Sequence, residues 1–161
     1  MKKITIYIIL IINVVFYSSN AVSKIVGDKI IIGTTFSITG KNSSKNIFYK
    51  NQLDKTIKNI NSLSGVSAGG KSYQFEIVYY DDMSNTGKAN QLLARLIQNE
   101  GVQFLIVLPN LKLSNLTKNL IKKYKISVIK SYEAVKIYKE TFETVNSVNN
   151  EKIRNFLLNN R

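Results

Sequence analysis

The amino-acid sequence predicts an α/β protein whose core is a doubly wound parallel sheet. Short segments typical of buried strands alternate along the chain with segments whose apolar residues recur every three or four positions, as on one face of a helix. The length of 161 residues leaves room for one such domain but not for two full ones. Alternating strands and helices form βαβ units with right-handed crossovers, so the sheet is expected to carry helices on both faces.

Four segments are predicted as strands. The first contains three consecutive Ile residues, a β-branched run typical of a strand that is covered on both faces. The second alternates apolar and polar positions, and the third is densely apolar. The predicted strands are residues 29–36, 73–80, 102–108 and 126–129. The Gly-containing stretch 64–70 is predicted as a plain loop, because it lacks the residue order of a phosphate-binding loop.

Four segments are predicted as helices: residues 49–60, 89–97, 113–124 and 149–160. The second is the most clearly amphipathic. Leu93 and Leu96 share one helical face with Ala89 and Ile97, and this face is expected to pack against the sheet. The residues expected on the opposite face are Lys88, Gln91, Arg95 and Gln98.

The loops that follow the predicted strands are the expected binding region. In open α/β sheets, ligands bind beyond the carboxyl ends of the strands. The relevant loops are residues 37–45, 81–87 and 108–113, together with the loop after Ile129. Their hydroxyl and amide side chains could contact a solute, although each Ser taken alone is better explained as a solvated loop residue. The candidate ligand-binding residues are Ser37, Ser43, Asn110, Ser114 and Ser131.

Composition argues against catalysis. The chain has no Cys and no His, which excludes disulfides, thiolate nucleophiles and imidazole acid–base chemistry. Asp81 and Asp82 form the one adjacent carboxylate pair, and they could serve as a metal or acid–base site. The favoured interpretation is structural, with Asp accepting backbone N–H bonds in a turn before a helix. No catalytic residue, cofactor or metal is therefore predicted.

The formal net charge of +13 does not predict a nucleic-acid partner. A nucleic-acid footprint needs basic residues gathered on one face. Here Lys residues are spread through every segment, and the densest cluster is Lys122, Lys123 and Lys125 at a predicted helix end. The charge is interpreted as a solvated basic surface.

Residues 1–23 are predicted as a signal peptide, which places the mature protein in the periplasm. Lys2 and Lys3 precede an almost wholly apolar stretch, residues 4–16, and small residues follow it. Ser19 and Ala21 form a workable recognition pair for signal peptidase. An uncleaved membrane anchor is the alternative, but the apolar stretch is shorter than the roughly 20 residues that a spanning helix needs. Residues 24–161 would then form the α/β lobe.

Taken in order, several segments resemble the branched-chain amino-acid (Leu/Ile/Val) binding proteins of ABC importers, within the type 1 periplasmic binding protein family. They are residues 30–33 leading to 36–40, then 59–61, 65–66, 77–82, 88–92, 100–102 and 142–145. The resemblance implies two α/β lobes that close around a solute, of which this chain would supply the first. It also implies a membrane permease as partner and an amino acid as solute. A separately encoded second lobe is an open alternative.

The sequence departs from this family in the loops with which family members bind their ligand. Members usually have small hydroxyl residues after the third strand, where this chain has residues 109–112, Pro-Asn-Leu-Lys. After the fourth strand they tend to have Pro and a small-residue turn, where this chain has residues 130–133, Lys-Ser-Tyr-Glu. Lys41 replaces the usual Pro of the first loop. The scaffold is therefore expected to be better retained than the site.

The leading functional hypothesis is the solute-binding component of an ABC importer in truncated form, without enzymatic activity. One alternative is a remnant of such a protein that binds nothing. Another is a free-standing flavodoxin-like regulator, which would need a phosphate-binding loop or a reactive residue at a strand end. The sequence shows neither.

Export should cleave the chain between about Asn20 and Lys24. N-terminal sequencing of protein recovered from the periplasm measures the cleavage point directly. Recovery of a chain that still begins at Met1, in a membrane fraction, would contradict the signal-peptide prediction.

Overall fold

A computed structural model describes residues 25–160 of the chain, so the predicted signal peptide, residues 1–23, lies outside the described residues. The strands are β1 (Ile25–Val26), β2 (Lys29–Phe36), β3 (Val66–Ala68), β4 (Lys71–Asp81), β5 (Phe104–Ile106) and β6 (Ser127–Ile129). The helices are α1 (Ser43–Ser62), α2 (Thr86–Gln98), α3 (Asn115–Lys123), α4 (Ala134–Val145) and α5 (Asn150–Asn159). Within the described range, none of these helices is long and apolar enough to cross a membrane.

The sheet is mostly parallel, as predicted. Its strand order is β3-β4-β2-β5-β6, and β1 pairs with β2 off this path. Strands β4, β2, β5 and β6 run parallel, whereas β1 and β3 are antiparallel additions. Ile32 of β2 lies opposite Ile77 of β4 on one side and Phe104 of β5 on the other. The predicted Ile-rich strand is therefore the centre of the sheet.

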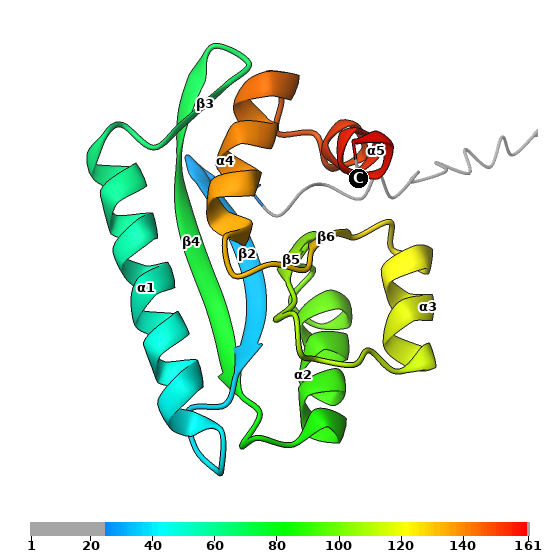
Figure 1. Ribbon diagram of the computed structural model, residues 1–161. Coiled ribbons are helices and arrows are strands. Elements are labelled where there is room, and N and C mark those ends of the chain that lie inside the picture. Colours follow the sequence, from blue (N-terminus) through cyan, green and yellow to red (C-terminus); the bar gives the residue numbers. More distant parts are fainter. Residues whose placement is uncertain (1–24, 161) are drawn as a thin grey trace, which may run out of the picture.

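Helices cover both faces of the sheet, which confirms the doubly wound arrangement (Figure 1). Successive strand residues point to opposite faces, so β2 sends Ile30 and Ile32 to one side and Ile31 to the other. Likewise Phe104 and Leu105 of β5 enter different cores. The first core is closed by α1, α4 and α5, and the second by α2 and α3.

Three elements were not predicted from the sequence, and the first is β1, which pairs with β2. The stretch 64–70, predicted as a plain loop, contains β3, which pairs with β4 in an antiparallel hairpin. Gly69 and Gly70 turn the chain there with φ angles of 60° and 75°, a region that glycine adopts without strain. Helix α4 was also not predicted. Its Tyr138 is fully buried and donates its hydroxyl hydrogen to the carbonyl oxygens of Leu105 and Ser127, which ties α4 to the two strands below it.

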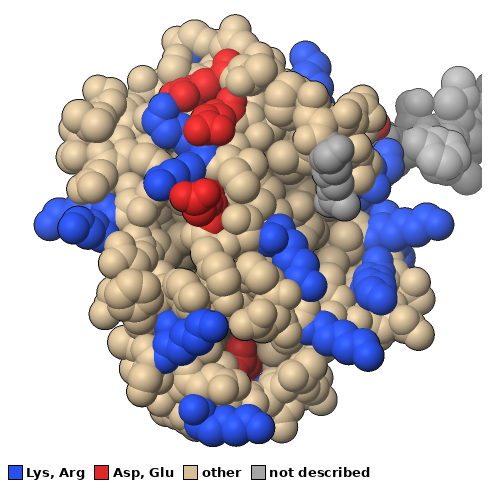
Figure 2. Space-filling model, in the orientation of Figure 1, with Lys and Arg blue, Asp and Glu red and all other residues tan. Residues whose placement is uncertain are grey.

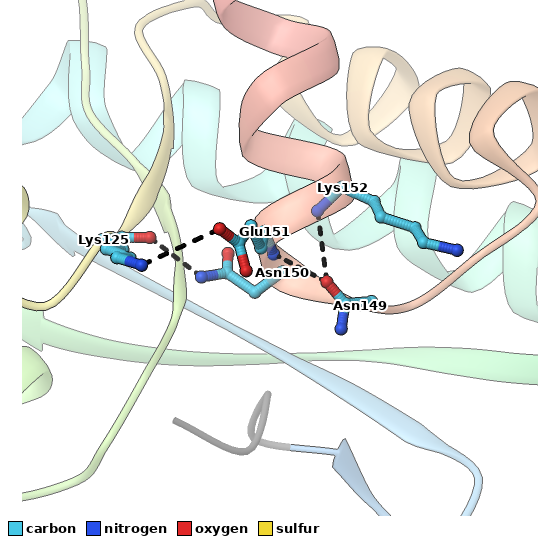
Figure 3. Close-up of polar contacts among 5 residues, drawn as sticks. All are labelled: Lys125, Asn149, Asn150, Glu151 and Lys152. Atoms are coloured by element: carbon cyan, nitrogen blue, oxygen red, sulfur yellow. Dashed lines mark hydrogen bonds and ion pairs between the residues drawn. The ribbon is translucent and has the colours of Figure 1, made fainter. Parts of the chain in front are cut away.

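The last predicted helix, α5, is fastened to the sheet through its first turn (Figure 3). Asn149 caps the helix by accepting hydrogen bonds from two backbone N–H groups. The Asn150 side chain donates to the Lys125 carbonyl and accepts the Ser127 hydroxyl at 2.6 Å. Lys125 and Glu151 form an exposed ion pair at 3.7 Å, which is of small energetic value beside these buried bonds.

Helix α2 packs as its sequence period predicts. The inward-facing residues are at most 2% exposed: Ala89, Leu93, Leu96 and Ile97. Of the residues predicted on the other face, Gln91, Arg95 and Gln98 are exposed and Lys88 is half-buried. The Asn85 side chain starts the helix by accepting the Lys88 backbone N–H. The helix thus lies against the β2–β5 region and brings its N-terminus to the carboxyl edge of the sheet.

Truncating Leu93 or Leu96 to Ala should lower the free energy of unfolding by about 2–5 kcal/mol, because each leaves a cavity in the core under α2. Gln91→Ala and Gln98→Ala are the matched controls on the exposed face and should cost about 0.5 kcal/mol or less. Urea unfolding of the four variants measures the difference. Similar losses for the Leu and Gln variants would contradict this packing.

Candidate functional site

Four loops meet around a hollow at the carboxyl ends of β2, β4, β5 and β6. The hollow has a volume of about 240 Å³ and is open to solvent. The three predicted loops and the loop after β6 all contribute to its wall. The lining residues are Thr35, Ser37, Asn42, Lys45, Asn46, Tyr49, Asp82, Ser84, Asn85, Thr86, Ala89, Leu108, Asn110, Leu111 and Tyr132. The hollow lies where open α/β sheets place their ligands.

Asp81 joins the loop after β2 to the turn after β4. Its Oδ1 accepts the backbone N–H groups of Ile38 at 2.9 Å, Thr39 at 3.2 Å and Met83 at 2.9 Å. Its Oδ2 accepts the Thr39 hydroxyl at 2.7 Å. Desolvation by burial raises the pKa of this carboxyl, but the bonds from Thr39, Met83 and Ile38 together outweigh it and hold the pKa below its ordinary value.

Asp82 faces the hollow from the same turn and is 6% exposed. Its Oδ1 accepts the Ser37 hydroxyl at 2.6 Å and the Ser84 backbone N–H at 3.0 Å. Both carboxylates therefore hold the turn, which agrees with the structural interpretation of the pair. The described residues contain no group of three Asp or Glu side chains placed to bind a metal ion.

Further contacts hold the loop after β2 against the turn after β4. Ser84 donates its hydroxyl hydrogen to the Thr39 carbonyl and accepts the Asn42 backbone N–H, each at 3.0 Å. Gly40 adopts a φ of 85°, and a Cβ built there would lie 2.6 Å from the Met83 carbonyl oxygen. A larger residue would push the loops apart, so Gly40 is required by both the turn and the close approach.

Two tyrosines form the wall of the hollow nearest α1. Tyr49 of α1 and Tyr132 of the loop after β6 stack with ring centroids 3.9 Å apart and planes 12° from parallel. Asn110 Nδ2 donates to the Tyr132 hydroxyl at 3.2 Å, which fixes that ring from the loop after β5. Burial and the neighbouring Tyr49 hydroxyl raise the pKa of Tyr132. Lys45 Nζ lies 5.7 Å from the centroid of Tyr49.

Of the five candidate residues, Ser37 and Asn110 line the hollow. Each already serves the scaffold, since Ser37 donates to Asp82 and Asn110 to Tyr132. A hydroxyl retains acceptor capacity and an amide keeps further donor and acceptor capacity after one such bond. Both residues therefore stay candidates for solute contact.

The other three candidate residues lie outside the lining of the hollow. Ser43 is in the first turn of α1, where its backbone N–H donates to the Gly40 carbonyl. Ser114 caps α3, with its hydroxyl accepting the Thr117 backbone N–H at 3.1 Å. Ser131 accepts the backbone N–H two residues ahead of it. Their part in binding stays a prediction, and the structure gives Ser114 a role in starting α3 and Ser131 a role in the turn before α4.

Sequence reasoning missed four residues that shape the hollow. Asp82 and Ser84 lie in the predicted loop 81–87, but the sequence favours a turn role for Asp82 and distinguishes no role for Ser84. Tyr49 was read as a core position of its helix, and Lys45 was not distinguished from the other Lys residues. The strand-end position of Asp82 was the one signal that could have drawn attention to it.

Positive charge is dispersed on the surface. Figure 2 shows the Lys and Arg side chains scattered over one face and separated by other residues, without merging into a single patch. Lys122, Lys123 and Lys125 are exposed at the end of α3, away from the lining of the hollow. This arrangement agrees with a solvated basic surface.

No family model matches the chain. Similar solved structures include the branched-chain amino acid transporter substrate-binding protein LivJ from Streptococcus pneumoniae in complex with isoleucine, at 19% identity and a TM-score of 0.48 over 63% of this chain and 28% of that one. Another is a solute-binding protein of an ABC transporter from Rhodopseudomonas palustris BisB5 in complex with 3,4-dihydroxybenzoic acid, at 23% identity and a TM-score of 0.46 over 64% and 27%. A third is an extracellular ligand-binding receptor from Rhodopseudomonas palustris HaA2, at 15% identity and a TM-score of 0.39 over 63% and 26%. The chain spans less than a third of the length of each of these proteins.

Acid should destabilise the protein through Asp81. A lowered folded-state pKa contributes stability that is present above the unfolded value of about 3.9 and is lost as pH falls through the folded value. Asp81→Asn should therefore flatten the fall in the urea midpoint between about pH 5 and pH 2. Glu140→Gln removes an exposed carboxylate of α4 as a control. Equal flattening in both variants would contradict the role given to Asp81.

Proposed function

We propose that this chain is a solute-binding lobe of an ABC importer and that the hollow holds one side of a small amino-acid-like solute. The observation that carries the proposal is the convergence of four strand-end loops on one polar hollow. Scaffold bonds between Asp81, Ser84 and the loop after β2 hold two of these loops in place before any solute arrives. Preorganised loops bind with a smaller loss of conformational entropy than loops that must order on binding.

The lining suits a solute with a charged head and a small apolar tail. Asp82 and Lys45 supply a carboxylate and a cation to the same hollow. Ala89, Leu108 and Leu111 supply an apolar area beside them. A branched-chain amino acid has both features, and the ordered sequence resemblance to Leu/Ile/Val binding proteins supports the same class of solute.

A second lobe and a permease belong to the same proposal. The volume of about 240 Å³ is below the roughly 300–1,000 Å³ of complete small-molecule sites, and the hollow is open on one side. A second lobe closing over it would complete the burial of a solute. The closed protein would deliver its solute to a membrane permease from the periplasm, the compartment implied by the predicted signal peptide.

The flavodoxin-like alternative is less well supported. In that class, the loop after the first parallel strand binds phosphate through backbone N–H groups. Here the Ile38 and Thr39 N–H groups already donate to Asp81, and the Asn42 N–H donates to Ser84. These three N–H groups are therefore not available to a phosphate. The non-binding remnant remains the rival hypothesis, and a binding measurement separates it from the proposal.

Leucine, isoleucine or valine should bind the protein weakly, with dissociation constants in the millimolar range, because one wall buries only part of a solute. Titration of the ¹⁵N-labelled protein followed by NMR should show saturable shifts of backbone amides around the hollow. Asn110→Ala should weaken binding, whereas Asn119→Ala, at an exposed position of α3, should not.

Two results would contradict this. Absence of saturable shifts with all three amino acids favours the non-binding remnant. Dissociation constants in the micromolar range or below would show that the hollow is already a complete site.

A further inference from the structure

One oxygen of the buried Asp82 carboxylate has no partner. Both hydrogen bonds to this side chain, from Ser37 and from the Ser84 backbone, end on Oδ1. Within residues 25–160, no hydrogen bond or ion pair reaches Oδ2. Asp82 is nevertheless 6% exposed, and it lines the hollow.

Asp82 Oδ2 keeps access to the hollow, which is open to solvent. A carboxylate taken out of water is costly unless hydrogen bonds or a cation compensate it. The neighbouring Asp81, although more exposed, has hydrogen-bond donors on both of its oxygens. Of these two adjacent carboxylates, only Asp82 keeps one oxygen without a hydrogen bond from the described residues.

The bonds to Oδ1 also orient the carboxylate. The Ser37 hydroxyl holds it at 2.6 Å from the end of β2, and the Ser84 N–H holds it at 3.0 Å from its own turn. A carboxylate fixed in this way presents Oδ2 with little freedom to rotate. Besides Asp82, Lys45 is the one charged residue in the lining, so the hollow holds one anionic and one cationic group.

We propose that Asp82 Oδ2 accepts the ammonium group of the solute, and that the site therefore selects solutes with a primary amine over carboxylic acids that lack one. The inference rests on the proposed function and assigns the substrate class within it. Lys45 is the matching group for the solute carboxylate. A charge-assisted hydrogen bond to a buried carboxylate is strong enough to make this discrimination.

Three probe molecules test recognition of the ammonium group and of the carboxylate group separately. Leucine carries both charged groups, 4-methylpentanoate lacks the ammonium, and 3-methylbutylamine lacks the carboxylate. In the unaltered protein, leucine and 3-methylbutylamine should shift the Ser84 amide resonance in ¹⁵N NMR titrations, whereas 4-methylpentanoate should leave that resonance in place. This measurement needs no variant, so it holds even if substitutions at the turn impair folding.

Asp82→Asn is the variant that tests the inference directly, because its side-chain oxygen can still accept from Ser37 and Ser84. It should weaken leucine and 3-methylbutylamine binding roughly tenfold or more, as expected for loss of a hydrogen bond to a charged group. Binding of 4-methylpentanoate should change less than about twofold. Glu140→Gln makes the same charge change at an exposed carboxylate of α4, outside the lining of the hollow, and should spare the preference for amines.

The outcomes distinguish the two levels of the proposal. If leucine binds the unaltered protein and Asp82→Asn leaves its affinity unchanged, the ammonium assignment is wrong while the solute-binding function stands. The same holds if Asp82→Asn weakens 4-methylpentanoate as much as leucine. If none of the three probes binds the unaltered protein, the proposed function fails and the assignment fails with it.

Discussion

The hydrogen bonds that cross from the turn after β4 to the loop after β2 are the interaction on which the site depends. Parallel strands fix only their own register, and the loops beyond them are free to diverge unless something joins them. Here Asp81 gathers three backbone N–H groups and a hydroxyl, and Ser84 connects the same two loops again. Gly40 allows the backbones to approach closely enough for these bonds to form. The hollow exists because these two loops are held as a unit.

The sheet beneath this junction provides the rigid base. Its central strand sends alternate side chains into two separate cores, each closed by helices from a different part of the chain. Helix α2 links the base to the site, since Leu93 and Leu96 hold it against the sheet while Asn85 and Thr86 at its start line the hollow. Packing at one end of this helix therefore positions polar groups at the other.

The stretches that depart from the Leu/Ile/Val binding proteins in sequence contact each other in the structure. Tyr132 and Asn110 occupy the two stretches where the sequence differs from that family, and they contact each other across the loops. Tyr132 also stacks on Tyr49, so aromatic rings fill this part of the wall. Asp82 and Lys45, the groups proposed to contact the solute, lie on other loops and are part of the lining.

The sequence by itself determined the elements whose signal is local. The Ile run of β2 and the apolar period of α2 predicted a doubly wound sheet, and the structure confirms their positions and buried faces. Tertiary structure decided which loop side chains meet. The stack of Tyr49 on Tyr132 and the hydrogen bond from Ser37 to Asp82 are not visible in any short window of sequence. The reason is that periodicity reports the burial of one element against an unspecified neighbour, whereas a site is built from residues far apart in the chain, whose contacts exist only once the strands have been ordered side by side.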